Sequence, residues 1–334
     1  MTLLKAMWGA MRRREFISLL GGAAILPLVA RAQERIRRIG VLMPYAKDNS
    51  EALARNAAFI EEFQRLGWTD GRNVKIEYRF DDTGDLRKTA TELLTLSPEV
   101  ILASATPAVA ALQQATRTVP IVFAVVSDPV SAGFAASLAK PGGNITGFAN
   151  FDYAMGAKWL ELLKEIAPNV TRVGVIRDPT VTASIGQLAA INSVAPSFGV
   201  EVSPLGGVDA GDIERTVTEF ARGPNGGLIV SATTLSANNR GLIISLAAQH
   251  RLPAIYPFPF FVADGGLICY GPDSIEPHRH AAHYVDRILK GEKPSDLPVQ
   301  TPTKFELVIN LKTAKALGLT IPNSVLSRAN QILE

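Results

Sequence analysis

The chain contains a single cysteine, Cys269, and lacks the short motifs of several large enzyme classes. It has no Gly-x-Gly-x-x-Gly dinucleotide loop, no Gly-x-x-x-x-Gly-Lys phosphate loop and no Gly-x-Ser-x-Gly nucleophile elbow. A lone cysteine excludes an internal disulfide, and a two-lobed amino-acid racemase would need two facing cysteines. We therefore expect no enzyme, no cofactor and no catalytic residues, with Cys269 as a buried, unreactive thiol.

Basic residues are not in excess once the first residues are set aside. The chain has 34 Lys and Arg against 31 Asp and Glu, but residues 1–32 carry five of the basic and one of the acidic residues. The remainder holds 29 basic and 30 acidic residues. A nucleic-acid-binding surface needs clustered Lys and Arg on the folded domain, so we expect no nucleic-acid partner.

The N-terminal apolar stretch, residues 19–29, is too short to span a bilayer, which takes roughly 20 apolar residues. It follows the basic residues 12–14 and precedes Ala30-Arg31-Ala32, a small-x-small cleavage site. Residues 1–32 therefore predict a signal peptide, twin-arginine-like, with the general secretory route as the alternative. Met11 is an alternative start. The predicted location is the periplasm.

The chain does contain an internal repeat with a period of about 130 residues. Residues 38–42 (RIGVL) recur as residues 172–176 (RVGVI), and Ser104-Ala105-Thr106 recurs as Ser231-Ala232-Thr233. A period of this length is too long for a solenoid and suits a whole domain. The repeat predicts two similar lobes with a ligand between them.

Strand and helix patterns alternate in both copies, which predicts an α/β protein with two doubly wound, Rossmann-like lobes of parallel strands joined by a hinge. Lobe 1 is predicted to comprise residues 33–149 and 274–334, and lobe 2 residues 150–273. The predicted strands are residues 36–44, 74–80, 100–104, 119–126 and 145–148, then 172–176, 201–205, 227–231, 253–256 and 266–270, and finally 305–311.

Polar residues at predicted strand ends are the candidates for ligand contact, because open parallel sheets bind ligands there. Thr106 is expected to cap a helix whose N-terminus attracts a carboxylate, and Thr233 with Thr234 is its counterpart. The alternative is that these threonines are ordinary caps without a ligand. Asp128 and Asp178 are expected either to accept from a ligand ammonium or to close their own turns.

Aromatic and histidine side chains complete the candidates. Tyr45, Tyr256 and Tyr270 are expected to wall the apolar part of the site. The group His278, His280 and His283 has a spacing typical of a metal site, but no Cys or paired carboxylate lies at a supporting distance in the sequence. We therefore predict a solvated helix face there and no metal.

Four longer segments resemble one known family. They are residues 126–133 (VSDPVSAG), 140–147 (KPGGNITG), 284–294 (YVDRILKGEKP) and 310–322 (NLKTAKALGLTIP). Together they resemble the ABC-transporter substrate-binding proteins whose studied members bind aromatic amino acids. The resemblance implies a type I periplasmic binding protein fold with three crossover strands, a monomer, and partner permease and ATPase subunits.

The resemblance also implies ligand contacts at the first loop, at the Ser-x-Thr-Pro turn, at Ser-Asp-Pro and on the first helix of lobe 2. The first loop, residues 44–48, lacks the His-Pro pair of the aromatic-amino-acid binders. The full set of candidate ligand-binding residues is Pro44, Tyr45, Ser104, Thr106, Pro107, Ser127, Asp128, Asp178, Thr180, Ser184, Thr233, Thr234, Tyr256 and Tyr270.

These inferences predict a periplasmic solute-binding component of an ABC importer. It would capture an amino acid or an aromatic or branched carboxylate by closure of the two lobes. The alternatives are a periplasmic sensor that signals to a membrane kinase and a two-lobed enzyme such as a glycosyltransferase.

Overall fold

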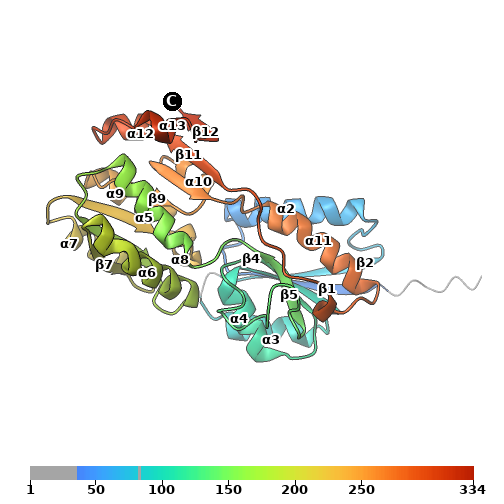
Figure 1. Ribbon diagram of the computed structural model, residues 1–334. Helices are drawn as coiled ribbons and strands as arrows, with labels where there is room; N and C mark the ends of the chain where they lie inside the picture. The colour runs from blue at the N-terminus through green and yellow to red at the C-terminus, as the bar shows by residue number, and fades with distance from the viewer. Residues whose placement is uncertain (1–35, 82–83) are drawn as a thin grey trace, which may run out of the picture. The chain divides into compact units, whose positions relative to one another are not determined.

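Two sheets organise residues 36–81 and 84–334, which are the residues that the computed structural model describes (Figure 1). The predicted signal peptide lies outside the described residues. The strands of the first sheet are β1 (Arg37–Met43), β2 (Val74–Phe80), β3 (Val100–Ser104), β4 (Ile121–Val126) and β5 (Ile145–Ala149). Those of the second are β6 (Arg172–Arg177), β7 (Glu201–Gly206), β8 (Gly226–Val230), β9 (Ala254–Tyr256), β10 (Ile268–Gly271), β11 (Glu306–Asn310) and β12 (Gln331–Leu333).

The two halves of the repeat form sheets with the same strand order. The first sheet runs β2-β1-β3-β4-β5, and the second contains β7-β6-β8-β9-β10 in the corresponding order. All pairs within these two sets of five strands are parallel. The predicted pair of doubly wound α/β lobes is therefore confirmed, and each of the eleven predicted strands overlaps an observed one.

Helices cover both faces of the first sheet, which explains its continuous apolar strands. Along β1, Ile39, Val41 and Met43 belong to one buried cluster, whereas Leu42 belongs to another. On one face, α2 (Ser50–Arg65) and α11 (Glu276–Leu289) lie side by side, and α3 (Leu86–Thr95) and α4 (Ala105–Ala115) lie on the other (Figure 1). Successive side chains of a strand point to opposite faces, so both faces of β1 are apolar.

Capping residues fix where the helices begin. Asn49 is the N-cap of α2, and its side-chain oxygen accepts from the backbone N–H groups of Glu51 and Ala52 at 3.0 and 3.1 Å. In the second lobe the helices are α5 (Met155–Ile166), α6 (Thr182–Val194), α7 (Ala210–Phe220), α8 (Thr234–Asn238), α9 (Arg240–Gln249), α10 (Pro259–Ala263), α12 (Leu311–Ala316) and α13 (Asn323–Leu326). No helix in the described ranges is both long enough and apolar enough to cross a membrane.

The chain passes between the two sheets three times, as the family resemblance implies. The crossings are residues 150–154 between β5 and α5, residues 272–275 between β10 and α11, and residues 300–305 before β11. Between the second and third crossings, α11 packs on α2 and against the first sheet. These segments are the only covalent connections between the lobes within the described part of the chain.

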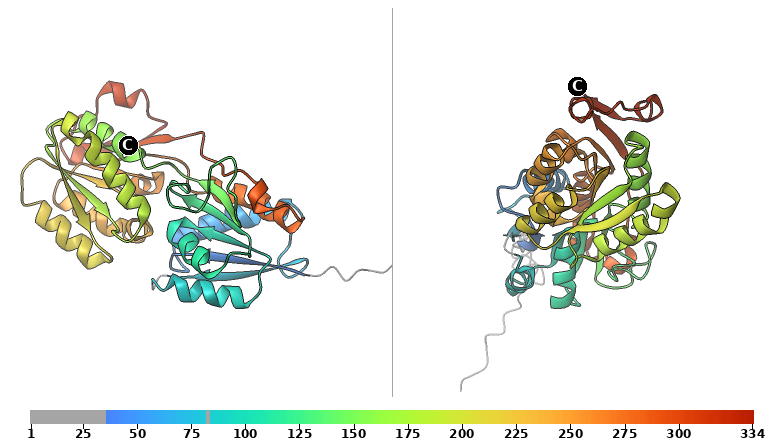
Figure 2. Two further views of the ribbon diagram at one scale, coloured as in Figure 1. Left: turned by 60° about the horizontal axis from the view of Figure 1, so that its bottom comes forward. Right: turned by 90° about the vertical axis from the view of Figure 1, so that its left-hand side faces the viewer.

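The C-terminal residues do not belong to lobe 1, contrary to the predicted boundary. β11 pairs antiparallel with β10 and β12 pairs parallel with β11, so residues 306–334 extend the second sheet. In the left view of Figure 2, the C-terminus lies at the second lobe and away from the first sheet. The apolar residues 307–309 can pair with either sheet, and strand propensity does not say which edge is open. The antiparallel pairing also makes the second sheet mixed rather than wholly parallel.

Candidate ligand-binding cavity

A small cavity of about 20 Å³ is lined by residues of both lobes. Its lining residues are Tyr45, Arg55, Ala105, Thr106, Pro107, Val125, Asn150, Val181, Ala232, Thr233, Thr234, Ala237 and Phe258. A volume of this size holds about one water molecule. A neighbouring hollow of about 390 Å³ shares Thr106, Pro107 and Val181 with the cavity in its lining.

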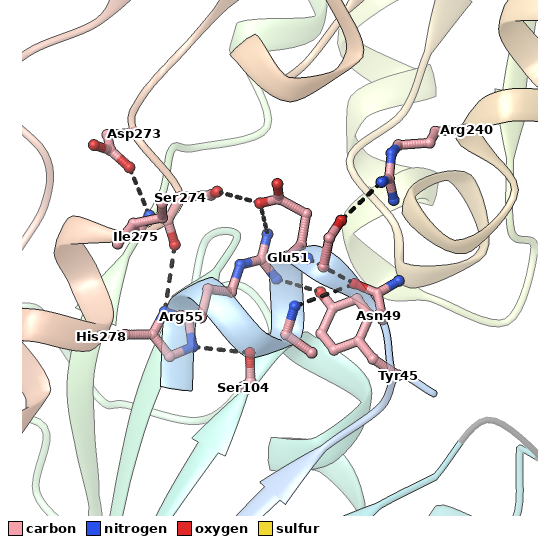
Figure 3. Close-up of polar contacts among 12 residues, drawn as sticks. Tyr45, Asn49, Glu51, Arg55, Ser104, Arg240, Asp273, Ser274, Ile275 and His278 are labelled. Carbon is pink, nitrogen blue, oxygen red and sulfur yellow. Dashed lines mark hydrogen bonds and ion pairs between the residues drawn. The ribbon is translucent and has the colours of Figure 1, made fainter. Parts of the chain in front are cut away.

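Tyr45 and Arg55 form the polar base of this cavity. Tyr45 follows β1, and its hydroxyl accepts a hydrogen bond of 2.6 Å from Nη1 of Arg55 (Figure 3). The guanidinium carbon also lies 5.2 Å from the centre of the Tyr45 ring, within the range of a cation–π contact. Arg55 is only 1% exposed. The predicted site residue Tyr45 therefore lies in the lining, held by Arg55, which is not among the predicted site residues.

The buried Arg55 is incompletely paired. Its Nη2 lies 4.0 Å from the Glu51 carboxylate, which also accepts from Ser274 Oγ at 3.3 Å (Figure 3). Its Nε has no hydrogen-bond partner among the described residues. An arginine carries five N–H donors and stays charged, and leaving such a donor unpaired in a buried position is costly. An anionic group within reach of Nε would complete its bonding.

His278, at the start of α11, lies near Arg55. Its ring is fully buried, with Nε2 3.0 Å from Ser104 Oγ and Nδ1 3.3 Å from the Ser274 carbonyl oxygen. Burial, and secondarily the charge of Arg55, hold the pKa of His278 well below its usual value of 6.5. The carbonyl can only accept, so Nδ1 carries the proton and Nε2 accepts from Ser104.

The predicted solvated histidine face is therefore wrong for His278. His280 and His283 are exposed, and their rings lie near Glu276 and Glu62, at 3.7 and 3.1 Å. A helix places positions 280 and 283 on a different face from the one that carries 278 into the core. No cluster of three or more His, Cys, Asp or Glu able to hold a metal occurs among residues 36–81 and 84–334.

The first turn of α4 contributes a second positive feature to the cavity. Ser104 rather than the predicted Thr106 occupies the N-cap position, two residues earlier in the chain. Because the Ser104 hydroxyl is bonded to His278, no side chain caps the helix. Thr106 and Pro107 in the first turn line the cavity. The first N–H groups of a helix and its dipole favour a negative charge at this position.

On the opposite lobe, Thr233 behaves as predicted. It is the N-cap of α8, and its hydroxyl accepts from the backbone N–H of Ser236 at 3.1 Å. Thr233 and Thr234 both line the cavity. Phe258 supplies an aromatic wall and packs on Phe151, with ring centres 6.1 Å apart.

The two candidate aspartates do not line the cavity. The Asp178 carboxylate accepts from the backbone N–H and the hydroxyl of Thr180, at 2.9 and 2.6 Å. The Asp128 carboxylate accepts from the backbone N–H of Ser131 at 3.0 Å. Both carboxylates therefore close turns of their own loops. Thr180 lines the neighbouring hollow, and Ser184 is buried and donates to the carbonyl oxygens of Asp178 and Val181.

The remaining candidates lie away from the cavity lining. Tyr256 is buried against Phe261, with ring centres 5.1 Å apart, and burial raises its pKa. Tyr270 stacks on Phe305 near the third crossing. Pro44, Ser104 and Ser127 are buried outside the lining. Cys269 is buried as expected, and burial raises the pKa of its thiol to about 12.

Arg55 could have been found in the sequence from its spacing. The buried face of α2 includes Ala52, Phe59 and Phe63, and position 55 falls on the same face. A charged residue at a core position of an amphipathic helix is rarely tolerated unless it is paired. That single exception in the apolar pattern was the available signal.

Comparison with known proteins agrees with this architecture. The family model for ABC transporter substrate binding proteins matches residues 38–333. A tyrosine-binding protein of Clostridioides difficile (strain R20291) is 29% identical over 263 residues, which cover 78% of this chain and 75% of that protein.

Two solved structures of related proteins have a similar fold. The ABC domain of Streptococcus pneumonia in complex with L-Trp is 27% identical, with a TM-score of 0.81, and the match covers 89% of this chain and 100% of that one. A ligand-free, open substrate binding protein with adhesive properties from Clostridium difficile is 26% identical, with a TM-score of 0.63 over 89% of this chain and 99% of that one.

These matches confirm the type I periplasmic binding protein fold, which repressor-like proteins share at 13% identity and a TM-score of 0.58. Members of the matched family are extracytoplasmic binding proteins and not enzymes. The repeated lobes, the crossings between them and the match along residues 38–333 lead to one conclusion: the chain belongs to the ABC transporter substrate-binding proteins.

Proposed function

We propose that this protein captures a small carboxylate with an aromatic or apolar body and presents it to an ABC importer. Amino acids and aromatic or branched carboxylates are the ligand classes in question. The observation that carries the proposal is the incompletely paired Arg55 beside the uncapped start of α4, in a cavity lined by both lobes. Both features favour a negative charge at the same place.

The rest of the lining suits the body of such a ligand. Val181, Ala232, Ala237 and Phe258 of the second lobe are apolar, and Tyr45 offers a ring from the first. A few polar groups among apolar and aromatic walls are the usual composition of small-molecule sites. Tyrosine and tryptophan are the first amino acids to test, because proteins 29% and 27% identical to this chain bind them.

Hinge motion is the proposed mechanism of capture. The cavity of about 20 Å³ is too small for an amino acid, so a ligand must enter while the lobes are further apart. Closure at the three crossings would then bury the ligand, and a permease with its ATPase would accept the closed form. Export to the periplasm through residues 1–32, by the twin-arginine or the general secretory route, is part of the same proposal.

Thermal unfolding of the purified protein against a ligand panel tests the proposal. The panel contains the amino acids, aromatic and branched carboxylates, and small neutral sugars. A ligand present at 100 times its dissociation constant should raise the free energy of unfolding by about 2.7 kcal/mol, a shift of several degrees. Shifts with carboxylates support the proposal. A shift only with sugars would reject this ligand class. The absence of a shift with every compound of the panel would reject it as well.

A further inference from the structure

We infer that Arg55 binds the ligand carboxylate directly and that the site requires this carboxylate but does not require an α-ammonium group. The inference rests on the proposed function. It adds that the carboxylate is the group that every ligand must carry, and that ligands with and without an amino group should both bind. It follows from three observations on charge and bonding in the cavity.

The first observation is the donor that Arg55 leaves open. The side chain is 1% exposed and lines the cavity, yet its Nε has no partner within the described ranges. Nη1 is used by Tyr45, and Nη2 lies 4.0 Å from Glu51, which is long for a hydrogen bond. The guanidinium is therefore held in place by Tyr45 while keeping donor capacity for a carboxylate, the group that its planar fork matches best.

The second observation is that the N-terminus of α4, like Arg55, favours a negative charge in the cavity. This 11-residue helix presents Ala105, Thr106 and Pro107 to the cavity, and it has no side-chain cap. Ser104, which occupies the cap position, is fixed by His278 instead. The imidazole of His278 is neutral, because Nδ1 carries its one proton toward Ser274 and Nε2 accepts from Ser104. The histidine therefore adds no positive charge. Two independent features therefore favour an anion at one end of the cavity.

The third observation is that the cavity lining, as far as the structure describes it, lacks a carboxylate that could bind the ammonium of an amino acid. No acidic side chain occurs among the described residues that line the cavity. Asp128 and Asp178, for which an ammonium acceptor was one of two expected roles, bond to their own loops. In the neighbouring hollow, Asp85 caps α3 by accepting from the backbone N–H of Lys88. Burying an ammonium without a carboxylate partner is unfavourable, and the described lining offers the ammonium of an amino acid no charged partner.

Matched ligand series test the inference on the unmodified protein by calorimetric titration. Each of L-tyrosine, L-tryptophan and L-leucine is compared with its analogue lacking the amino group and its analogue lacking the carboxylate. For tyrosine these are 3-(4-hydroxyphenyl)propionate and tyramine. For tryptophan they are indole-3-propionate and tryptamine, and for leucine 4-methylpentanoate and 3-methylbutylamine.

In the series that binds, the analogue without the amino group should bind within about tenfold of the amino acid or more tightly, and the amine should not bind measurably. An amino acid that binds more than about tenfold tighter than its deaminated analogue would overturn the inference and leave the proposed function intact. Binding of the amine would show that the carboxylate is not required. If no acid of any series binds, the proposed ligand class itself fails.

Substitution of Arg55 adds a second readout. Arg55→Gln keeps a hydrogen bond to Tyr45 possible and removes the charge, so it should weaken binding of the carboxylate about 10- to 100-fold. Arg55→Lys keeps the charge without the fork and should fall between this variant and the original protein. Arg215→Gln, on the exposed face of α7, serves as the control and should bind normally. Unchanged affinity in a folded Arg55→Gln variant would contradict the inference.

Discussion

The Arg55 guanidinium and the Tyr45 hydroxyl are joined by a buried hydrogen bond of 2.6 Å that connects α2 with the loop after β1. The bond fixes a permanent cation at the base of a cavity lined by both lobes. On its other side, Glu51 links the arginine to Ser274 in the second crossing (Figure 3). The same side chains thus connect the proposed ligand site with a segment that joins the lobes.

Replacing Tyr45 by Phe should lower both stability and ligand affinity. The variant removes the acceptor of a buried, charged hydrogen bond and should cost about 1–3 kcal/mol in the free energy of unfolding. The freed guanidinium is no longer oriented, so affinity for the ligand should fall about tenfold. Urea unfolding and calorimetric titration measure the two effects.

Tyr284→Phe is the matched control for this prediction. Tyr284 donates to the carbonyl oxygen of Pro298 at 2.7 Å and does not line the cavity. It should lose stability but keep its ligand affinity. Equal losses of affinity in the two variants would mean that Tyr45 acts only through global stability.

Much of the fold could be predicted because a run of apolar residues in the local sequence marks a buried strand. Residues 100–103 and 121–126 are apolar throughout, as strands covered on both faces require, and both lie in strands with every residue buried. The sheet that β11 joins could not be predicted, since its pairing with β10 depends on which edge is open. No local pattern encodes that choice.

The site could be predicted only in part. Thr106, Thr233 and Tyr45 follow strands and do line the cavity, because parallel strands bring their carboxyl ends to one edge. The strand-end position of Asp178 left two roles open, acceptor for a ligand ammonium or closure of its own turn, and the role of His278 depended on the packing of helices. Asp178 bonds to Thr180 within its own turn, and His278 is buried by the packing of α11 on α2.

Replacing Gly271 by Ala should destabilise the second lobe and disturb the cavity. A Cβ atom at this position would lie 1.8 Å from the Pro257 carbonyl oxygen, and backbone cannot yield as a side chain can. We expect a loss of about 3 kcal/mol in the free energy of unfolding. Since Pro257 precedes Phe258 of the cavity wall, ligand affinity should fall as well.

Gly241→Ala tests whether any added methyl group has this effect. Position 241 lies in α9 with open space around it, so alanine should stabilise the protein by up to about 1 kcal/mol through helix propensity. Thermal unfolding of the two variants side by side measures the difference. A Gly271→Ala protein as stable as the original would show that the close approach to Pro257 is absent.

Stability should decline below about pH 6.5 because of His278. The imidazole has a lowered pKa in the folded protein, through burial and the nearby Arg55 charge, and its ordinary value of 6.5 when unfolded. Between these values the unfolded chain binds one proton more than the folded chain. The free energy of unfolding should therefore fall by up to about 1.4 kcal/mol for each pH unit below 6.5.

Urea unfolding between pH 5 and 8 isolates this contribution when the original protein is compared with two variants. His278→Gln should show a shallower decline below pH 6.5, whereas Arg215→Gln, which removes an exposed charge from α7 and no histidine, should keep the original slope. The same pH dependence in all three proteins would locate the titrating group elsewhere.

Contacts between the start of α2 and the second lobe should contribute to ligand affinity. Arg240 donates to Ser50 Oγ at 3.0 Å, and Asn49 Nδ2 lies 3.4 Å from Asn238 Oδ1. These exposed contacts join the start of α2 to α8 and α9 of the second lobe, so they stabilise the arrangement in which both walls of the cavity meet a ligand. Arg240→Ala should therefore weaken ligand binding about two- to fivefold, the range expected for an exposed polar contact.

A double-mutant cycle shows whether the effect belongs to this contact. Ser50→Ala should weaken binding by a smaller factor in the same direction. The double variant should bind no more weakly than Arg240→Ala alone, because both changes remove one hydrogen bond. Arg215→Ala, whose ion pair with Asp212 lies within α7, should leave affinity unchanged. If the two losses simply multiply in the double variant, Arg240 acts through Asp264 and Phe260 of its own lobe rather than across the cavity.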